Sequence, residues 1–486
     1  MIFNSFKFLI FFSLVFVIYY LVPKKARTGV LLVSSYIFYM CYKPSYVFLL
    51  MAITLVCYST AILLEKYKKY RRYIFGTGLA LILGTLVFFK YTNFIFEIVN
   101  SLSAEFSFLP DLNLPPLNIL VPLGISFQVF QNSGYVIDVF LGRIEAEKNL
   151  LYYSVFAAYF PTILSGPIER ATNLLPQIHS LQNKSNFEYG QVTDGLRLIL
   201  IGLIKKVAVA DVIAVYVNAV YDEPTVYTGI PLILATLLYS LQIYCDFSGY
   251  SDMATGISKM LGINLMRNFD TPYLSKSMAE FWRRWHISLS TWFRDNVYIP
   301  LGGNRVSLSR HLFNLLITFI VSGIWHGANG TFFIWGTLHG FFLCVGVLKK
   351  KYLKKQHTRD TTVMTICRII CVYLLTSFAW IFFRANSISD AVYIVTNLFN
   401  ISSVSIGTIR TAVGSMGFTI PTLILSITLI VLLVLIDIVS YNKEIERQIS
   451  SLSIIKRWVL YIVFTFVIII GMMVAVDAQT FIYFQF

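Results

Sequence analysis

The chain has 486 residues, of which 57% are hydrophobic and 13% are charged. Because charged residues make up about a quarter of an ordinary soluble domain, this composition excludes a water-soluble protein and predicts an integral membrane protein. The net charge of +15 would suit a nucleic-acid partner. However, the basic residues form short clusters between apolar runs, at 23–27, 65–72, 349–359 and 443–458. This is the positive-inside pattern of cytoplasmic loops, so the lipid bilayer is the expected partner and nucleic acid is not.

The first apolar run, at 6–21, has no basic region before it and no small-residue cleavage site. We therefore expect it to be retained as a first helix and not removed as a signal peptide. A pair of helices is predicted at 28–42 and 45–63, and a longer one at 74–98. If each basic cluster is cytoplasmic, the N-terminus lies outside.

A proline-rich stretch without basic residues then ends at Gly124, and it suits an outer loop that re-enters the membrane. A helix at 123–140 returns inside. The segment 150–170 is broken by Pro161 and Gly166, and it is predicted to be re-entrant. Irregular backbone at membrane depth must be buried in protein or line a cavity.

Helices are expected at 194–220 and 229–245, followed by a polar region at 246–311. Aromatic and charged residues alternate near helical spacing in SMAEFWRRWHISLSTWFRDNVY, which predicts an amphipathic helix at the cytoplasmic interface. Further spans are predicted at 312–325, 331–348, 365–383, 420–440 and 458–475. The total is roughly twelve spans, which places both termini outside. The fold class is therefore an all-α polytopic membrane protein.

A single integral-membrane domain is expected over 1–486. It divides into N-terminal helices at 1–150, a catalytic core with re-entrant segments at 151–350 and C-terminal helices at 351–486. The six cysteines are scattered, and none forms a CxxC pair. We interpret them as packing residues and expect no metal and no bound cofactor.

Two histidines in apolar, aromatic surroundings are the strongest candidates for chemistry. A titratable group in or beside a membrane helix is costly and therefore marks a functional site, and histidine suits proton transfer near neutrality. His326 follows an apolar run between Trp325 and Gly327, and His286 lies 40 residues earlier beside two arginines. The alternatives are a structural hydrogen-bonding role for His326 and interfacial anchoring for the segment of His286. For His339, packing is favoured over chemistry.

A second polar set lies in YCDFSGYSDMATG at 244–256. Asp246 and Asp252 are predicted near a membrane helix end. They either orient a histidine or bind a polar substrate, or they belong to a helix cap or turn, for which Asp, Ser and Gly are common.

Five blocks together resemble the membrane-bound O-acyltransferase superfamily, and within it the bacterial alginate O-acetyltransferase type. They are FWRRWHISLSTWFRDNVYIPLGGNR, SGIWHGANGTFFIWGTLHG, QIYCDFSGYSDMATGISKMLG, PTILSGPIER and the closing FIYFQF. The resemblance covers essentially the whole chain. It implies a ring of about 11–12 tilted transmembrane helices, with re-entrant and amphipathic segments around a central cavity.

The resemblance also implies a reaction. An acetyl group would move from cytoplasmic acetyl-CoA across the bacterial inner membrane toward hydroxyls of a cell-surface polysaccharide. An extracytoplasmic partner of the SGNH serine-hydrolase type would pass it on. The family's catalytic histidine maps to His326, and its second position maps to His286. His326 would act as general base or carry a transient acyl group, and His286 would orient the donor or stabilise an oxyanion.

Further residues of these blocks are candidates for substrate binding. Arg283, Arg284 and Arg294 suit the phosphates of coenzyme A, although snorkelling to the interface explains them equally well. The remaining candidates are Trp285, Asp246, Asp252, Trp325 and Asn329. The alternatives are D-alanyl transfer from an acyl carrier protein to teichoic acid, a transporter, or a scaffold for a partner acetyltransferase. The D-alanyl branch lacks the PLGGNR continuation, which favours acetyl transfer.

Overall fold

The structure is a computed structural model that describes residues 1–106, 113–164, 166–183, 187–353, 361–401, 405–475 and 482. These residues form helices and no strand, which confirms the all-α prediction. Eight helices within the described residues have the length and hydropathy to cross a membrane. They are α3 (Tyr46–Lys66), the continuous helix Lys68–Glu105, α12 (Ile230–Met260), α15 (Leu308–His326), α16 (Gly330–Tyr352), α17 (Thr362–Arg384), α20 (Ile420–Ser440) and α22 (Ile454–Val474).

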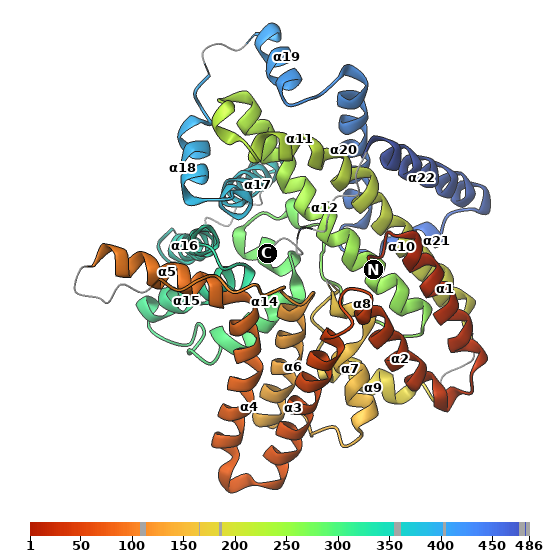
Figure 1. Ribbon diagram of the computed structural model, residues 1–486. Coiled ribbons are helices and arrows are strands. Elements are labelled where there is room, and N and C mark those ends of the chain that lie inside the picture. Colours follow the sequence, from red (N-terminus) through yellow and green to blue (C-terminus); the bar gives the residue numbers. More distant parts are fainter. Residues whose placement is uncertain are drawn as a thin grey trace. The chain divides into compact units, whose positions relative to one another are not determined.

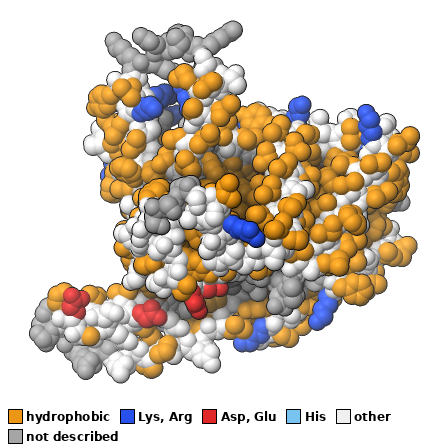
Figure 2. Space-filling model, turned by 90° about the horizontal axis from the view of Figure 1, so that it is seen from above, with side chains coloured by type: hydrophobic (Ala, Val, Ile, Leu, Met, Phe, Trp, Pro, Cys, Tyr) orange, Lys and Arg blue, Asp and Glu red, His pale blue; other side chains and the backbone are white. Residues whose placement is uncertain are grey.

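The surface fits a lipid environment. On the face shown in Figure 2, hydrophobic side chains predominate, while lysine and arginine side chains are scattered. Phe6, Ile455 and Met473 are 75%, 74% and 76% exposed. Such exposure of large apolar side chains along helices is stable in contact with lipid tails and costly in water. The chain is therefore a multi-pass membrane protein.

Several of the roughly twelve spans expected from length alone are shorter or interrupted. Helices α1 (Phe6–Leu21) and α6 (Ile125–Phe140) have 16 residues each. The span expected at 194–220 is divided into α10 (Tyr189–Leu203), the π-helix η4 (Ile204–Ala210) and α11 (Asp211–Tyr221). The ring of helices around a central cavity stays a prediction.

The described chain forms two compact units, one of residues 1–192 with 257–266 and the other of 193–256 with 267–486. In the first unit, α3, α6 and the start of the long helix lie side by side (Figure 1). The long helix consists of η2 (Lys68–Tyr70), α4 (Arg71–Leu86), η3 (Val87–Tyr91) and α5 (Thr92–Glu105). The unit also contains η1 (Lys24–Ala26), α2 (Arg27–Met40) and α9 (Ala171–Ser180).

The segment predicted to be re-entrant is broken two residues before Pro161, which lies in the first turn of a new short helix. Helix α7 (Leu150–Ala158) and helix α8 (Phe160–Ile163) are separated by Tyr159. All side chains from 153 to 164 are buried. The Phe160 N–H donates to the Ser35 hydroxyl at 3.0 Å. The irregular backbone is thus buried in protein and hydrogen-bonded, as the low polarity of a membrane requires.

In the second unit, α12 is longer than predicted. It continues to Met260 instead of ending near 245, so Asp246 and Asp252 lie in a helix interior and not at a cap or turn. Two glycines explain the error, because they serve close helix packing. A Cβ atom on Gly249 would lie 2.7 Å from the carbonyl oxygen of Gly202, and one on Gly256 would lie 2.5 Å from that of Gly195.

The amphipathic segment is not one continuous helix and its aromatic side does not face outward, while its position at the cytoplasmic interface stays a prediction. It is divided into α13 (Met278–Arg284), α14 (Ile287–Phe293) and the π-helix η7 (Arg294–Tyr298). The tryptophans of α13 and α14 are buried in the second unit. The alternation of aromatic and charged residues therefore reflects protein contacts on the aromatic side, where an interfacial helix would contact lipid.

Helices α15 and α16 form a closely packed hairpin in the same unit. A Cβ atom on Gly323 would lie 3.2 Å from the Cα of Gly336, so both glycines are needed for this approach. The other helices of the second unit are η5 (Pro224–Val226), η6 (Pro272–Leu274), α17, α18 (Ile388–Asn397), α19 (Ile406–Ser415), α20, α21 (Ile445–Ser450) and α22.

Candidate active site

His326 is the last residue of α15, and its side chain is buried by aromatic rings. The Trp325 and Trp335 rings contact it edge-on, each with a centroid separation of 4.9 Å. The Phe383 ring of α17 lies 5.3 Å away. These rings restrict the access of water to the imidazole.

His286 joins α13 to α14 and is fully buried. Its backbone has φ 43° and ψ 55°, a left-handed conformation that costs a non-glycine residue roughly 1–2 kcal/mol. Its ring packs edge-on against Phe247 at 4.6 Å and lies 6.5 Å from the Trp325 ring. Trp325 therefore stands beside both histidines, and the structure brings the two predicted catalytic residues into one aromatic cluster.

The interruption between α13 and α14 at His286 is stabilised by hydrogen bonds to a neighbouring segment of the same unit. The Asp270 N–H donates to the carbonyl oxygen of Arg284 at 2.9 Å, and the Ile287 N–H donates to that of Asn268 at 2.9 Å. These two backbone hydrogen bonds lie on either side of His286. A strained backbone conformation persists only where its surroundings impose it, and such positions cluster at functional sites.

Asn268 determines which nitrogen of His286 carries the proton. Its Oδ1 accepts hydrogen bonds from the Ser288 N–H at 3.2 Å and the Ser288 hydroxyl at 2.9 Å. Its Nδ2 donates to the Ser251 hydroxyl at 3.2 Å. The His286 Nδ1 lies 3.1 Å from the same Oδ1 and must therefore donate to it. In a neutral imidazole this leaves the lone pair on Nε2.

Burial keeps this ring neutral. It lowers the pKa of His286 from its ordinary 6.5 to about 3, because the charged imidazolium would lose its hydration. Asn268 is not among the site residues predicted from the sequence. The available signal was weak, since an Asn between Arg267 and Phe269 matches no motif that could be interpreted without the fold.

His339 also belongs to this cluster, although the sequence favours packing for it. It is fully buried, and the Trp282 indole N–H donates to its Nδ1 at 3.3 Å. The Trp335 ring lies 4.9 Å from both His326 and His339. In the hairpin of α15 and α16, Trp335 thus lies between two histidines and makes an edge-on contact with each.

The two candidate aspartates have lysine partners. Asp246 lies 2.6 Å from the Lys206 Nζ, which also contacts Asp211 at 2.8 Å. All three side chains are buried. Asp252 binds the Lys205 Nζ at 2.7 Å, nearer the surface of the unit. These contacts assign both aspartates a structural ion-pair role, and substrate binding by them stays a prediction.

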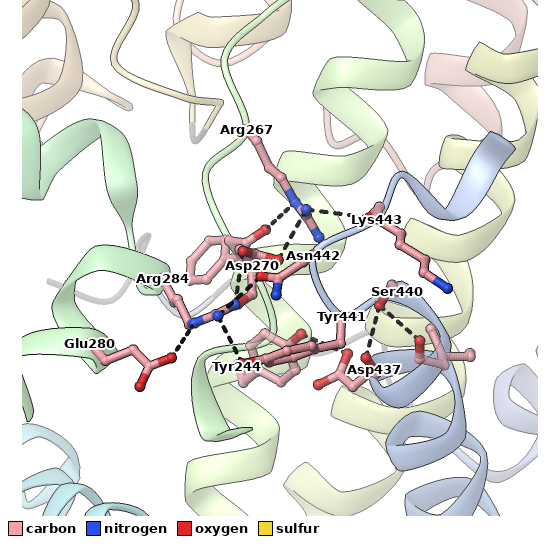
Figure 3. Close-up of polar contacts among 12 residues, drawn as sticks. Tyr244, Arg267, Asp270, Glu280, Arg284, Asp437, Ser440, Tyr441, Asn442 and Lys443 are labelled. Atoms are coloured by element: carbon pink, nitrogen blue, oxygen red, sulfur yellow. Dashed lines mark hydrogen bonds and ion pairs between the residues drawn. The ribbon is translucent and has the colours of Figure 1, made fainter. Parts of the chain in front are cut away.

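The predicted arginines differ in their environment. Arg284 lies between Glu280 and Asp270, with N–O distances of 3.1 Å and 2.9 Å, and it also donates to the Tyr441 hydroxyl at 3.1 Å (Figure 3). It therefore fixes the end of α13 just before His286. Arg283 and Arg294 are exposed, and Arg294 contacts Asp295 at 2.8 Å.

The remaining predicted binding residues have packing or capping contacts. Trp285 is buried, with its ring 5.0 Å from that of Trp380. Asn329 caps α16 by accepting a hydrogen bond from the Thr331 N–H at 3.1 Å, and it donates to the Asn386 carbonyl at 3.1 Å. Asn329 thereby fixes the turn that follows His326. Across the described ranges, no three His, Cys, Asp or Glu side chains form a group that could hold a metal ion.

Comparison with known proteins now identifies the chemistry. Residues 17–385 match the model of the membrane-bound O-acyltransferase family. The chain belongs to this family. The matched region of this O-acyltransferase includes His286, His326 and His339 together with Asn268, and it ends just after α17.

Individual relatives are similar over most of this O-acyltransferase. "Probable alginate O-acetylase AlgI" of Azotobacter vinelandii is 37% identical, over 80% of this chain and 76% of its own length. "Peptidoglycan O-acetyltransferase" of Helicobacter pylori is 32% identical, over 77% of this chain and 74% of its own. "Teichoic acid D-alanyltransferase" of Bacillus subtilis is 31% identical over 53% of this chain and 68% of its own. The similarity to the O-acetyltransferases thus covers the larger share of the chain.

Proposed function

We propose that this O-acyltransferase moves an acetyl group from cytoplasmic acetyl-CoA across a bacterial inner membrane toward hydroxyls of a cell-surface polysaccharide. An extracytoplasmic partner of the SGNH type would complete the transfer. The observation that carries the proposal is the pair of buried imidazoles beside Trp325, one of them fixed in a single tautomer by Asn268. The extent of similarity to relatives named as O-acetyltransferases supports acetyl over D-alanyl transfer.

The proposed step needs a base. His326 takes the proton of the acceptor hydroxyl while the hydroxyl oxygen attacks the thioester carbonyl carbon. The carbon–sulfur bond then breaks, and the thiolate of coenzyme A takes the proton from His326. A positioned general base contributes roughly 10²–10⁴-fold to such a reaction. The surrounding rings support this role because they limit hydrolysis of the thioester by water.

His286 is assigned the orienting role in this proposal. Its Nδ1–H is committed to Asn268, so Nε2 is an acceptor and not a donor. An acceptor suits a hydroxyl group and does not suit an oxyanion, which requires N–H donors. Of the two roles predicted for His286, substrate orientation is therefore better supported than oxyanion stabilisation.

The decisive experiment replaces His326. We expect His326→Ala to lower polysaccharide acetylation at least about 100-fold in cells that lack the native gene. The matched control is His179→Ala, because His179 is exposed on α9 and contacts Glu147 and the Tyr152 ring, neither of which belongs to the histidine cluster. Full acetylation by a folded His326→Ala variant would refute the catalytic assignment.

The donor and the class of protein are tested with the purified enzyme. We expect transfer or hydrolysis of labelled acetyl-CoA, and no turnover of a D-alanyl carrier protein. The reverse result would favour D-alanyl transfer. Turnover of neither substrate, with intact binding of a partner acetyltransferase, would favour the scaffold.

A further inference from the structure

The first unit contains a hollow lined mostly by cations, at the turn between α3 and α4. It has a volume of about 730 Å³, and its lining consists of Lys68, Lys69, Arg71, Arg72, Tyr73 and Phe140. Four of these six residues are basic and none is acidic. The feature does not involve the histidine cluster, so an inference from it is independent of the proposed function.

The acidic residues nearby in sequence have other partners. The Glu65 carboxylate accepts a hydrogen bond from the Ala146 N–H at 2.5 Å. Asp138 forms a salt bridge with Arg143 at 2.8 Å. Within the described part of the chain, no salt bridge reaches any of the four lining cations. Their positive charges are therefore available to an anion from outside the chain.

One wall of the hollow is fixed in position. The Arg71 Nη2 donates to the carbonyl oxygen of Val139 at 2.7 Å, and the guanidinium lies 5.4 Å from the centroid of the Phe140 ring. Phe140 in turn stacks on Phe75 at 4.0 Å. A cation held in this way loses little conformational entropy when a ligand binds. Lys68, Lys69 and Arg72 are exposed, and Lys69 lies 5.7 Å from the centroid of the exposed Tyr70 ring, so all three can turn toward a ligand.

The position of the hollow indicates the source of the anion. It lies at the end of α3 and the start of the long helix, both of which have the length and hydropathy of membrane spans. Tyr67, Tyr70 and Tyr73 around it are 44%, 53% and 78% exposed. Exposed tyrosines at the end of apolar helices are typical of the membrane–water interface, where lipid headgroups lie.

We propose that this basic hollow binds the phosphate of an anionic phospholipid headgroup. Each lysine or arginine near an anionic membrane strengthens binding roughly fivefold, and four cations around one phosphate select an anionic headgroup over a zwitterionic one. The nucleotide phosphates of coenzyme A have the same chemistry. The interfacial position favours the lipid, and the experiment separates the two sources.

The test uses the full chain, purified in detergent. Its thermal unfolding midpoint is measured while dioleoyl phosphatidylglycerol is added, with dioleoyl phosphatidylcholine as the reference lipid. We expect phosphatidylglycerol to raise the midpoint by several degrees and high salt to reduce the effect. The phosphatidylglycerol concentration that gives half of the maximal shift should be at least about tenfold higher for the double variant Lys69→Gln/Arg72→Gln than for the wild type. Both side chains are exposed, so the fold tolerates their replacement.

The matched control is Lys349→Gln/Lys350→Gln, which removes two exposed cations from the end of another span, α16. It should respond to phosphatidylglycerol like the wild type. An equal response of both double variants, or an equal shift with phosphatidylcholine, would overturn the proposal. A shift with adenosine 3′,5′-bisphosphate that depends on Lys69 and Arg72, without one for phosphatidylglycerol, would assign the hollow to a nucleotide. Acetyl transfer is measured separately and does not enter this result.

Discussion

At the scale of single residues, Asn268 is the side chain on which the proposed role of His286 depends. Replacing it by alanine removes the acceptor of a buried N–H group, which costs about 1–3 kcal/mol, and it frees the ring to change tautomer. We expect Asn268→Ala to lower kcat about 10–100-fold while KM for acetyl-CoA changes little. Steady-state kinetics of the purified enzyme measure this.

If Asn268 had only a structural role, its replacement would leave the dependence of activity on pH unchanged. The pH profile of activity is therefore a second measurement. In Asn268→Asp the acceptor is kept, but a negative charge beside the ring favours the imidazolium. The variant should therefore lose activity at a higher pH than the wild type does. An exposed control, Asn183→Ala, should resemble the wild type. Identical profiles for Asn268→Asp and the wild type would reduce Asn268 to a packing residue.

The buried imidazole of His286 also makes stability depend on pH. Its pKa is about 3 in the folded state and near 6.5 when exposed. Below pH 6.5 the unfolded chain binds a proton that the folded chain does not, so stability is complete above pH 6.5 and is lost as the pH falls toward 3. At pH 5 the loss is about 2 kcal/mol. A smaller decrease of the thermal midpoint in His286→Gln than in the wild type, between pH 7.5 and 5, would confirm this.

At the scale of elements, apolar run length predicted most of the long helices. The helices predicted at 331–348, 365–383 and 420–440 lie within α16, α17 and α20. The prediction of where α12 ends was wrong. The Asp, Ser and Gly residues of 244–256 suggested a helix end or turn, yet Gly249 and Gly256 lie inside α12, where the absence of a side chain allows another helix to approach. Sequence alone does not distinguish a glycine that ends a helix from one that permits close packing.

The elements around the histidines show a similar limit. The histidines themselves were predictable, because a titratable side chain in an apolar sequence is rare. The break between α13 and α14 was not, since the segment has helical spacing throughout and a positive φ is uncommon at any single non-glycine residue, histidine included. The left-handed conformation is imposed by hydrogen bonds from residues 268–270. Such contacts depend on tertiary structure and have no local signal.

At the scale of the whole molecule, a buried ion triad joins parts of the second unit that are distant in sequence. Lys206 in η4 contacts Asp211 at the start of α11 and Asp246 in α12. The Asp246 Oδ2 also accepts a hydrogen bond from the N–H of Ile482 at 2.7 Å. Gly471 of α22 packs closely on η4, where its Cβ position lies 2.7 Å from the Cα of Ala208. The π-helix thus provides both the cation and the surface that connect α12 with the end of the chain.

Lys206 and the adjacent Lys205 allow the contribution of this triad to stability to be tested with two matched variants. Lys206→Met leaves two buried carboxylates without their cation, and breaking a buried ion pair in this way costs about 3–5 kcal/mol. Lys205→Met removes the same charge one residue earlier, but of its two acidic neighbours Asp252 is 27% exposed and solvated by water, and the buried Asp437 keeps a hydrogen bond from the Tyr244 hydroxyl. We therefore expect a larger decrease of the thermal midpoint and of membrane expression for Lys206→Met than for Lys205→Met.

The same pair distinguishes stability from chemistry. Asp246 lies on α12 with Phe247, whose ring contacts His286, so disruption of the triad should displace the histidine cluster as well as weaken the fold. Any Lys206→Met protein that folds should then have lost acetyl transfer, and a second replacement that neutralises one of the freed carboxylates, Asp211→Asn, should restore part of the stability. If Lys206→Met and Lys205→Met had equal midpoints, the triad would contribute no more than a solvated ion pair.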